Sequence, residues 1–244
     1  MSTPSMNFRV GKGATAQQVA NPPKQSGLGT RALSALVLAP PVLATIYFGS
    51  PYFEILIAVA AGLMALEWSR VCASAANRSL WMGAGALYIL APCLSLVWLR
   101  GDPAIGRETV FWMFVLVWAA DIGAYAFGRM IGGPRLAPAI SPKKTWAGFI
   151  GGISCAGVTG AVTAIMLGKG SIIPLAVVSL ALGAVSQGGD LLESWIKRHF
   201  KVKDAGNIIP GHGGVLDRVD GLLAVAAATA LIGSSGKGNI LSWL

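Results

Sequence analysis

Four residues between positions 190 and 198 have types and spacings that suit chemistry on phosphate. Asp190, Ser194 and Lys197 are four and three residues apart, so in a helix they lie on one face, with Arg198 beside them. That face offers a carboxylate, a hydroxyl and two cations. Carboxylates can hold a divalent metal ion, and cations can offset the charge of phosphate oxygens. The spacing therefore indicates a site for transfer at phosphorus.

A second charged group follows further along the chain. Asp217 and Asp220 are three residues apart, and so share a face where another helix is expected to begin, with Arg218 between them. The segment that joins the two groups includes Lys203, Asp204, His212, Gly213 and Gly214. Its glycines allow backbone N–H groups to approach an anion closely. We expect the loop and the two helix ends to form one site.

Polar residues of the same kinds precede these groups, namely Asp121, Arg129, Ser141, Lys143, Lys144 and Thr145. Asp121 lies within an apolar stretch, where a carboxylate is costly, and it is therefore a functional candidate. Lys143 and Lys144 fit either an anchor at the membrane surface or a functional contact with a ligand. The neighbouring hydroxyl residues favour the functional contact. Glu54 and Glu67 lie near the ends of apolar stretches, where a carboxylate is cheaper, and a structural role is expected for both.

The elements that position these residues are read from the hydrophobic pattern. Of the 244 residues, 54% are hydrophobic and only 12% are charged, and the apolar residues come in long blocks. A helix needs about 20 apolar residues to cross the hydrocarbon core. By that measure the chain has seven candidate spans, at 31–49, 52–69, 80–99, 109–128, 147–168, 171–192 and 219–235. The predicted fold is an all-α polytopic transmembrane helix bundle.

The distribution of basic residues predicts how this bundle is oriented. Lys and Arg residues that flank a span are retained on the cytoplasmic side. With the N-terminus inside, only four of the 19 Lys and Arg residues lie on the outer side, namely Arg100, Arg107, Lys169 and Lys237. This orientation brings the segments 129–146 and 193–218 to the same cytoplasmic face. We expect a multi-pass protein of the cytoplasmic (inner) membrane whose active site faces the cytoplasm.

The chain divides into a tail and one membrane domain. Residues 1–30 are polar and rich in Gly, Pro, Gln and Ser, which predicts a disordered cytoplasmic tail. Residues 31–244 form the transmembrane domain, with the catalytic signature at 190–220. Cys72, Cys93 and Cys155 are widely spaced and form no pattern of a metal site or a disulfide framework.

The charged stretch from Ser194 to Asp220 reads SWIKRHFKVKDAGNIIPGHGGVLDRVD. It resembles the full signature of the phosphatidate cytidylyltransferase (CDP-diacylglycerol synthase) family. Two upstream stretches, DIGAYAFGR at 121–129 and SPKKTWAG at 141–148, are similar to further stretches of that family. One position departs from the pattern, because the family usually has Glu where this chain has Ala147. The resemblance extends over residues 31–235, and is weaker over the first three spans.

The resemblance implies a nucleotidyltransferase that converts CTP and phosphatidate into CDP-diacylglycerol and pyrophosphate for phospholipid synthesis. It implies magnesium as the cofactor, with a potassium site beside it, and a homodimer. The expected partners are CTP, phosphatidate and the lipid bilayer, with no nucleic acid among them.

We assign roles to the residues on this basis. Asp190 and Asp217 are the expected metal ligands, and Lys197, Arg198 and Arg218 screen the phosphates of both substrates. Ser194, His212 and Asp220 position these groups. The remaining candidates are expected to bind substrate, namely Asp121, Arg129, Ser141, Lys143, Lys144, Thr145, Lys203, Asp204, Gly213 and Gly214. Because phosphate charge would be left uncompensated, we expect Lys197→Ala to lose turnover and to leave stability nearly unchanged.

Two other functions stay open at this point. A CTP-dependent lipid kinase of the polyprenol type would transfer the γ-phosphate to an alcohol, and would need a base to activate that alcohol. An ion-coupled transporter would have its charged residues spread at mid-depth over several helices. In this sequence the charges gather near one predicted face, which argues against the transporter, while the part of CTP that enters the lipid would distinguish the kinase.

Overall fold

A computed structural model describes residues 28–206, 208, 213–235 and 238–243. Seven long helices dominate this part of the chain, and they are α1 (Leu28–Phe48), α2 (Tyr52–Val71), α3 (Arg78–Arg100), α4 (Gly106–Met130), α5 (Trp146–Met166), α6 (Ile173–His199) and α7 (Leu216–Ser235). A short helix, α8 (Ile240–Trp243), follows them. His212 and residues 1–27 of the expected tail lie outside the described residues, while residues 28–30 begin α1.

Each predicted span coincides with one long helix, and α6 shows the largest difference. The sequence predicts an end at residue 192 because charged residues begin there, but the helix continues to His199. One side of this helix end is packed and the other is open. Glu193 and Ile196 are buried, while Leu192 and Trp195 are exposed. The charged residues of the signature therefore project from a helix end that is packed on one side.

Among the described residues, five helices, α2 to α6, are long and apolar enough to cross a membrane. The first turns of α7 carry Asp217, Arg218 and Asp220, which lowers its apolar character, and the described apolar part of α1 is the shorter segment Val37–Phe48. Large apolar side chains such as Leu87 and Leu94 are exposed on the outside of the bundle, as contact with lipid requires. The chain is thus an α-helical, multi-pass membrane protein.

Helices α4, α5 and α6 pack closely because small residues lie between them. The most extensive packing joins α4 to α5, α5 to α6 and α6 to α7. A Cβ atom added at Gly160 in α5 would lie 2.5 Å from the Leu175 carbonyl oxygen in α6, and one added at Gly152 would lie 2.7 Å from the Ala120 carbonyl oxygen in α4. These close approaches between backbones hold α4, α5 and α6 together.

A short β-hairpin between α4 and α5 was not predicted from the sequence. Strand β1 (Arg135–Ala137) pairs antiparallel with β2 (Ser141–Thr145), and Arg135 is the partner of Thr145. Gly132 and Gly133 precede the hairpin with φ values of 69° and 92°, a backbone that glycine adopts readily. The hairpin places Lys143 and Lys144 at the start of α5.

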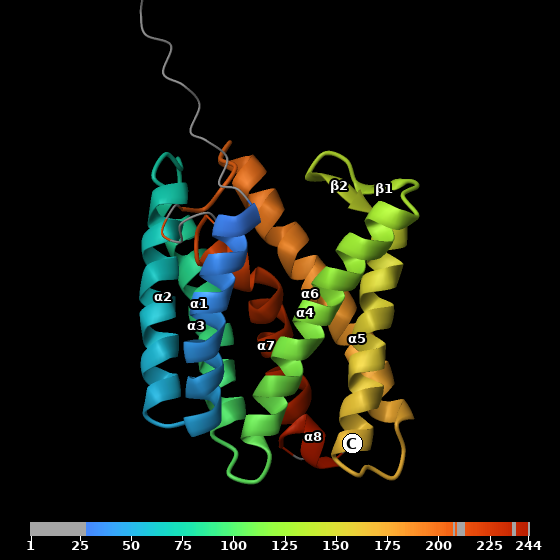
Figure 1. Ribbon diagram of the computed structural model, residues 1–244. Coiled ribbons are helices and arrows are strands. Elements are labelled where there is room, and N and C mark those ends of the chain that lie inside the picture. Colours follow the sequence, from blue (N-terminus) through green and yellow to red (C-terminus); the bar gives the residue numbers. More distant parts are fainter. Residues whose placement is uncertain (1–27, 207, 209–212, 236–237, 244) are drawn as a thin grey trace, which may run out of the picture.

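The hairpin and the end of α6 lie at the same end of the bundle (Figure 1). At that end, Arg198 Nε on α6 donates to the carbonyl oxygen of Ile140, between the strands, over 3.4 Å. The described parts of segments 129–146 and 193–218 therefore lie at the same end of the bundle, as predicted, and the cytoplasmic side of that end stays a prediction. Arg100 ends α3 and Arg107 lies in the first turn of α4, and both are at the opposite end of the bundle.

Candidate functional site

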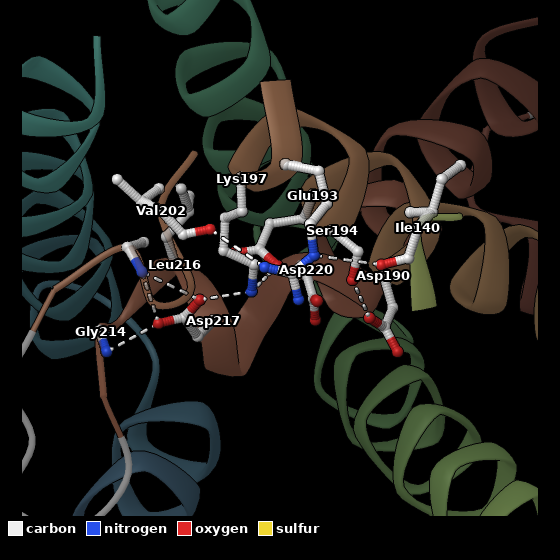
Figure 2. Close-up of polar contacts among 12 residues, drawn as sticks. Ile140, Asp190, Glu193, Ser194, Lys197, Val202, Gly214, Leu216, Asp217 and Asp220 are labelled. Atoms are coloured by element: carbon white, nitrogen blue, oxygen red, sulfur yellow. Dashed lines mark hydrogen bonds and ion pairs between the residues drawn. The ribbon is translucent and has the colours of Figure 1, made fainter. Parts of the chain in front are cut away.

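A lysine between two carboxylates joins α6 to α7. Lys197 Nζ lies 2.5 Å from Glu193 Oε2, one turn earlier on α6, and 2.7 Å from Asp217 Oδ1 at the start of α7. The Glu193 and Asp217 side chains are only 2% and 5% exposed, and that of Lys197 is 13% exposed. These three side chains form a charged cluster with little exposure to solvent, in which the cation compensates two anions (Figure 2).

Asp217 also organises the loop that precedes its own helix. Its Oδ2 accepts hydrogen bonds from the backbone N–H groups of Gly214 at 2.9 Å and Ala205 at 3.0 Å. Gly213, with a φ of 87°, turns the chain just before this contact. Asp217 thus occupies the position at which a carboxylate satisfies the free N–H groups around a helix start.

A cluster of three carboxylates lies beside the contact of Lys197 with Glu193 and Asp217. One carboxylate oxygen each of Asp190, Glu193 and Asp220 lie within 4.8 Å of one another. Asp190 and Glu193 are one turn apart on α6, and Asp220 comes from the facing turn of α7 (Figure 2). Glu193 Oε1 is buried and accepts no hydrogen bond from the described residues. Three carboxylate oxygens this close repel one another unless a cation lies near.

The hairpin brings such a cation to the outer side of the group. Lys144 Nζ in β2 lies 2.6 Å from Asp190 Oδ2 and 3.3 Å from the Gln187 side-chain oxygen. On its other side, Asp190 Oδ1 accepts a hydrogen bond of 3.3 Å from the Ser194 hydroxyl. The predicted alignment of Asp190 and Ser194 on one helix face is therefore confirmed, and the hairpin closes over that face.

Lys144, Gln187 and Asp190 line a cavity of about 760 Å³ at one end of the bundle. Its lining contains equal numbers of carboxylates and cations. The carboxylates are Asp121, Asp190, Glu193, Asp204, Asp217 and Asp220, and the cations are Arg129, Arg135, Lys143, Lys144, Lys197 and Arg218. Tyr125 and Phe149 add aromatic surface. The volume and the mixed charge suit a polyanionic ligand that arrives with a metal ion.

Most residues predicted for the site line this cavity, and the others have different positions. Arg198 points to the Ile140 and Val202 carbonyl oxygens, and so ties the end of α6 to the hairpin. Thr145 lines the cavity, but its hydroxyl also caps α5 by accepting the N–H of Gly148 at 3.1 Å. The predicted residues absent from the described lining are Ser141, Ser194, Arg198, Lys203, Gly213 and Gly214. His212 lies outside the described residues.

The predicted metal pair, Asp190 and Asp217, is not brought together as one group of carboxylates. Asp217 is absent from the group that Asp190 forms with Glu193 and Asp220, because its oxygens are engaged by Lys197 and by backbone N–H groups. The Asp190 and Asp217 pairing stays a prediction, and the contacts favour Asp220 and Glu193 as the neighbours of Asp190.

Among the charged and amide residues of the described lining, three were missed in the sequence. Glu193 lies three residues after Asp190 and four before Lys197, a spacing that could have placed it on the same face. Gln187 and Arg135 have no such pattern, and reach the cavity through helix packing and the hairpin. Ala147, where a glutamate was expected from the resemblance, lies in the first turn of α5 beside the cavity residue Gly148.

Comparison with known proteins finds one matching family and several proteins of similar sequence. The profile of the Cytidylyltransferase family matches residues 73–235. The phosphatidate cytidylyltransferase of Brucella suis biovar 1 (strain 1330) is 49% identical over 154 residues, which cover 63% of this chain and 57% of that protein. The phosphatidate cytidylyltransferase of Rickettsia bellii (strain RML369-C) is 36% identical over 217 residues, which cover 86% and 92%.

A third relative, the phosphatidate cytidylyltransferase of Staphylococcus haemolyticus (strain JCSC1435), is 42% identical over 146 residues, which cover 59% of this chain and 52% of that protein. The chain therefore spans little more than half the length of the Brucella and Staphylococcus proteins in these matches.

The buried contact of Lys197 with Glu193 and Asp217 changes the expectation that Lys197→Ala leaves stability nearly unchanged. The substitution would leave two buried carboxylates without their cation, and breaking such a buried pair costs about 3–5 kcal/mol. We expect a clear loss of thermal stability in detergent, measured against Lys203→Ala, whose lysine is exposed. Equal melting temperatures for the two variants would contradict the role of Lys197 as the link between α6 and α7.

Proposed function

Because this chain belongs to the Cytidylyltransferase family, as its signature predicted, we propose that it transfers the cytidylyl group of CTP to phosphatidate. The products are CDP-diacylglycerol and pyrophosphate. The observation that supports this most directly is one cavity, at the end of a lipid-exposed bundle, in which three clustered carboxylates lie beside several cations. A nucleotide can enter such a site from water while a lipid phosphate reaches it from the membrane surface.

The residues fit this reaction without a dedicated base. An oxygen of the phosphatidate phosphate attacks the α-phosphorus of CTP, the new P–O bond forms, and the bond to the β-phosphate oxygen breaks. The nucleophile is already an anion, so no proton has to be removed. Catalysis of this kind rests on positioning and on compensating negative charge. Lys144, Lys197 and Arg218 line the cavity and are placed to do so.

The cluster of three carboxylates fits the magnesium ion that the family resemblance implies. Magnesium prefers oxygen ligands, and Asp190, Glu193 and Asp220 offer three carboxylates within 4.8 Å. Glu193 Oε1 accepts no hydrogen bond from the described residues, which is a further reason to place a cation there. When bound, the metal would supply positive charge against the phosphates. The expected potassium site and the expected homodimer stay predictions.

The clustering of charge bears on the two alternative functions. Six carboxylates and six cations of the described residues line one cavity at one end of the bundle, whereas a transporter would need charged residues at mid-depth in several helices. A lipid kinase would share the cavity chemistry, and it differs in which part of CTP enters the lipid. The product therefore distinguishes it from a cytidylyltransferase.

The reaction is tested with purified protein, phosphatidate, magnesium and CTP labelled either in cytosine or at the γ-phosphorus. We expect the cytosine label to enter lipid and the γ label to leave as pyrophosphate. Arg218→Ala should reduce kcat/KM by about 100-fold, because it removes one cation that faces the phosphates. Arg78→Ala, at the start of α3 and outside the cavity lining, is the control. A γ label in lipid would mean that the protein is a kinase.

The metal site is tested with Mn²⁺ as a spectroscopic probe of binding. We expect Asp190→Asn and Asp220→Asn each to weaken Mn²⁺ binding and to abolish magnesium-dependent turnover, with the double variant little worse than either, because the ligands act as a unit. Asp102→Asn, between α3 and α4, is the control. If Asp217→Asn weakens Mn²⁺ binding while Asp220→Asn leaves it unchanged, the ligands are instead the pair predicted from sequence.

We also propose seven spans, a cytoplasmic N-terminus and a cytoplasmic site. Supporting this, Arg100, Arg107 and Lys169 lie at the end opposite the hairpin, and basic residues are concentrated at the hairpin end. In intact cells, a single cysteine at position 203 of a variant without Cys72, Cys93 and Cys155 should resist a membrane-impermeant thiol reagent and react after lysis. Labelling before lysis would reverse the orientation.

A further inference from the structure

A fully buried carboxylate from α2 contacts the loop before α7. Glu67 is 0% exposed and lies one turn from the end of α2. Its Oε1 accepts the N–H of Val215 and its Oε2 accepts the N–H of Leu216, each at 2.9 Å. These N–H groups belong to the start of α7, where a helix has no acceptors of its own. Negative charge is favourable at that position.

Both sides of the loop converge on this carboxylate. A Cβ atom added at Gly206 would lie 2.7 Å from Glu67 Oε1, and one added at Gly214 would lie 2.7 Å from Oε2. The two glycines therefore provide the space that the Glu67 side chain occupies. Residues 206 and 214 both lie against the Glu67 carboxylate. We call these two positions the neck of the loop, and Glu67 holds them together.

A second carboxylate holds the same neck from the side of the cavity. Asp217 accepts the N–H groups of Ala205 and Gly214, and Glu67 accepts those of the next two residues, Val215 and Leu216. Three successive N–H groups are thus divided between two carboxylates. Asp217 faces Lys197 and the cavity, whereas Glu67, which is not among the described cavity lining, reaches the neck from α2.

We propose that Glu67 is a positioning residue for the active site: by fixing the neck of the loop and the start of α7, it sets the positions of Asp217, Arg218 and Asp220 in the cavity. The proposal rests on the proposed function for its kinetic consequence. Glu67 precedes the segment 73–235 that matches the family profile, so α2 contributes to a site whose other residues come from that segment.

A purely structural role would give a different result from a positioning role. A cap that only stabilised the fold would lower the melting temperature and leave kcat/KM of the folded protein unchanged. A positioning residue controls where the phosphate-facing groups lie, and a misplacement of about 1 Å can cost about 100-fold in rate. The two roles are therefore separable by kinetics on folded protein, together with a local measure of the loop.

The test compares Glu67→Gln with Glu54→Gln, a substitution at the opposite end of the same helix and outside the cavity lining. Gly206→Ala is the second variant, because its methyl group pushes the neck away from an intact Glu67. Gly83→Ala, where an added Cβ meets nothing within 4 Å, is its control. Two readouts are taken on each protein in detergent: amide hydrogen exchange of the peptide covering 213–217, and kcat and KM for CTP at saturating magnesium.

We expect Glu67→Gln and Gly206→Ala to speed exchange of that peptide by roughly tenfold or more, since a hydrogen bond to a charged acceptor is lost or lengthened. Both should lower kcat/KM by about 100-fold, with exchange in α3 and α5 unchanged. Unchanged exchange at 213–217, or wild-type kcat/KM despite faster exchange there, would overturn the proposal. If the wild-type protein makes no cytidylyl lipid, the proposed function fails, while the exchange data still decide whether Glu67 holds the neck.

Discussion

The arrangement of the site depends on one buried charge interaction, the contact of Lys197 with Glu193 and Asp217. It joins the extended end of α6 to the beginning of α7, and its two carboxylates are almost completely shielded from water. A cation between two buried carboxylates stabilises them. Because Lys197 is placed by the helix that also carries Asp190, the position of α7 is set relative to the Asp190 face, and Asp220 meets Asp190 and Glu193.

The surplus of negative charge next to this contact explains why the cavity is suited to a metal and a polyanion together. Asp190, Glu193 and Asp220 exceed what Lys197 can neutralise, and Lys144 from the hairpin compensates only the outer side of Asp190. A bound divalent ion would complete the compensation, and the cations on the remaining walls would then be available to phosphate. The same groups spread over an apolar bundle would be costly, and gathering them at one end lowers that cost.

The sequence predicted what depends on local pattern. Each predicted apolar block corresponds to one of the helices α1 to α7, and the spacing of Asp190 and Ser194 correctly placed them on one face. Contacts between distant segments were not predictable in this way. Lys144 meets Asp190 because an unrecognised hairpin folds over α6, and Glu67 meets the loop before α7 through packing of α2. A glutamate near a span end is usually interfacial, so nothing local distinguished Glu67 from Glu54.

The central claim is that the groups from α6, α7 and the hairpin form one cavity that binds CTP with its metal. An experimental structure with CTP and Mn²⁺, using the anomalous signal of manganese, tests it most directly. The account predicts a manganese peak among the Asp190, Glu193 and Asp220 carboxylates, with the triphosphate between that peak and the Lys144 and Arg218 side chains. A nucleotide bound outside this cavity, or a manganese ion away from all three carboxylates, would contradict it.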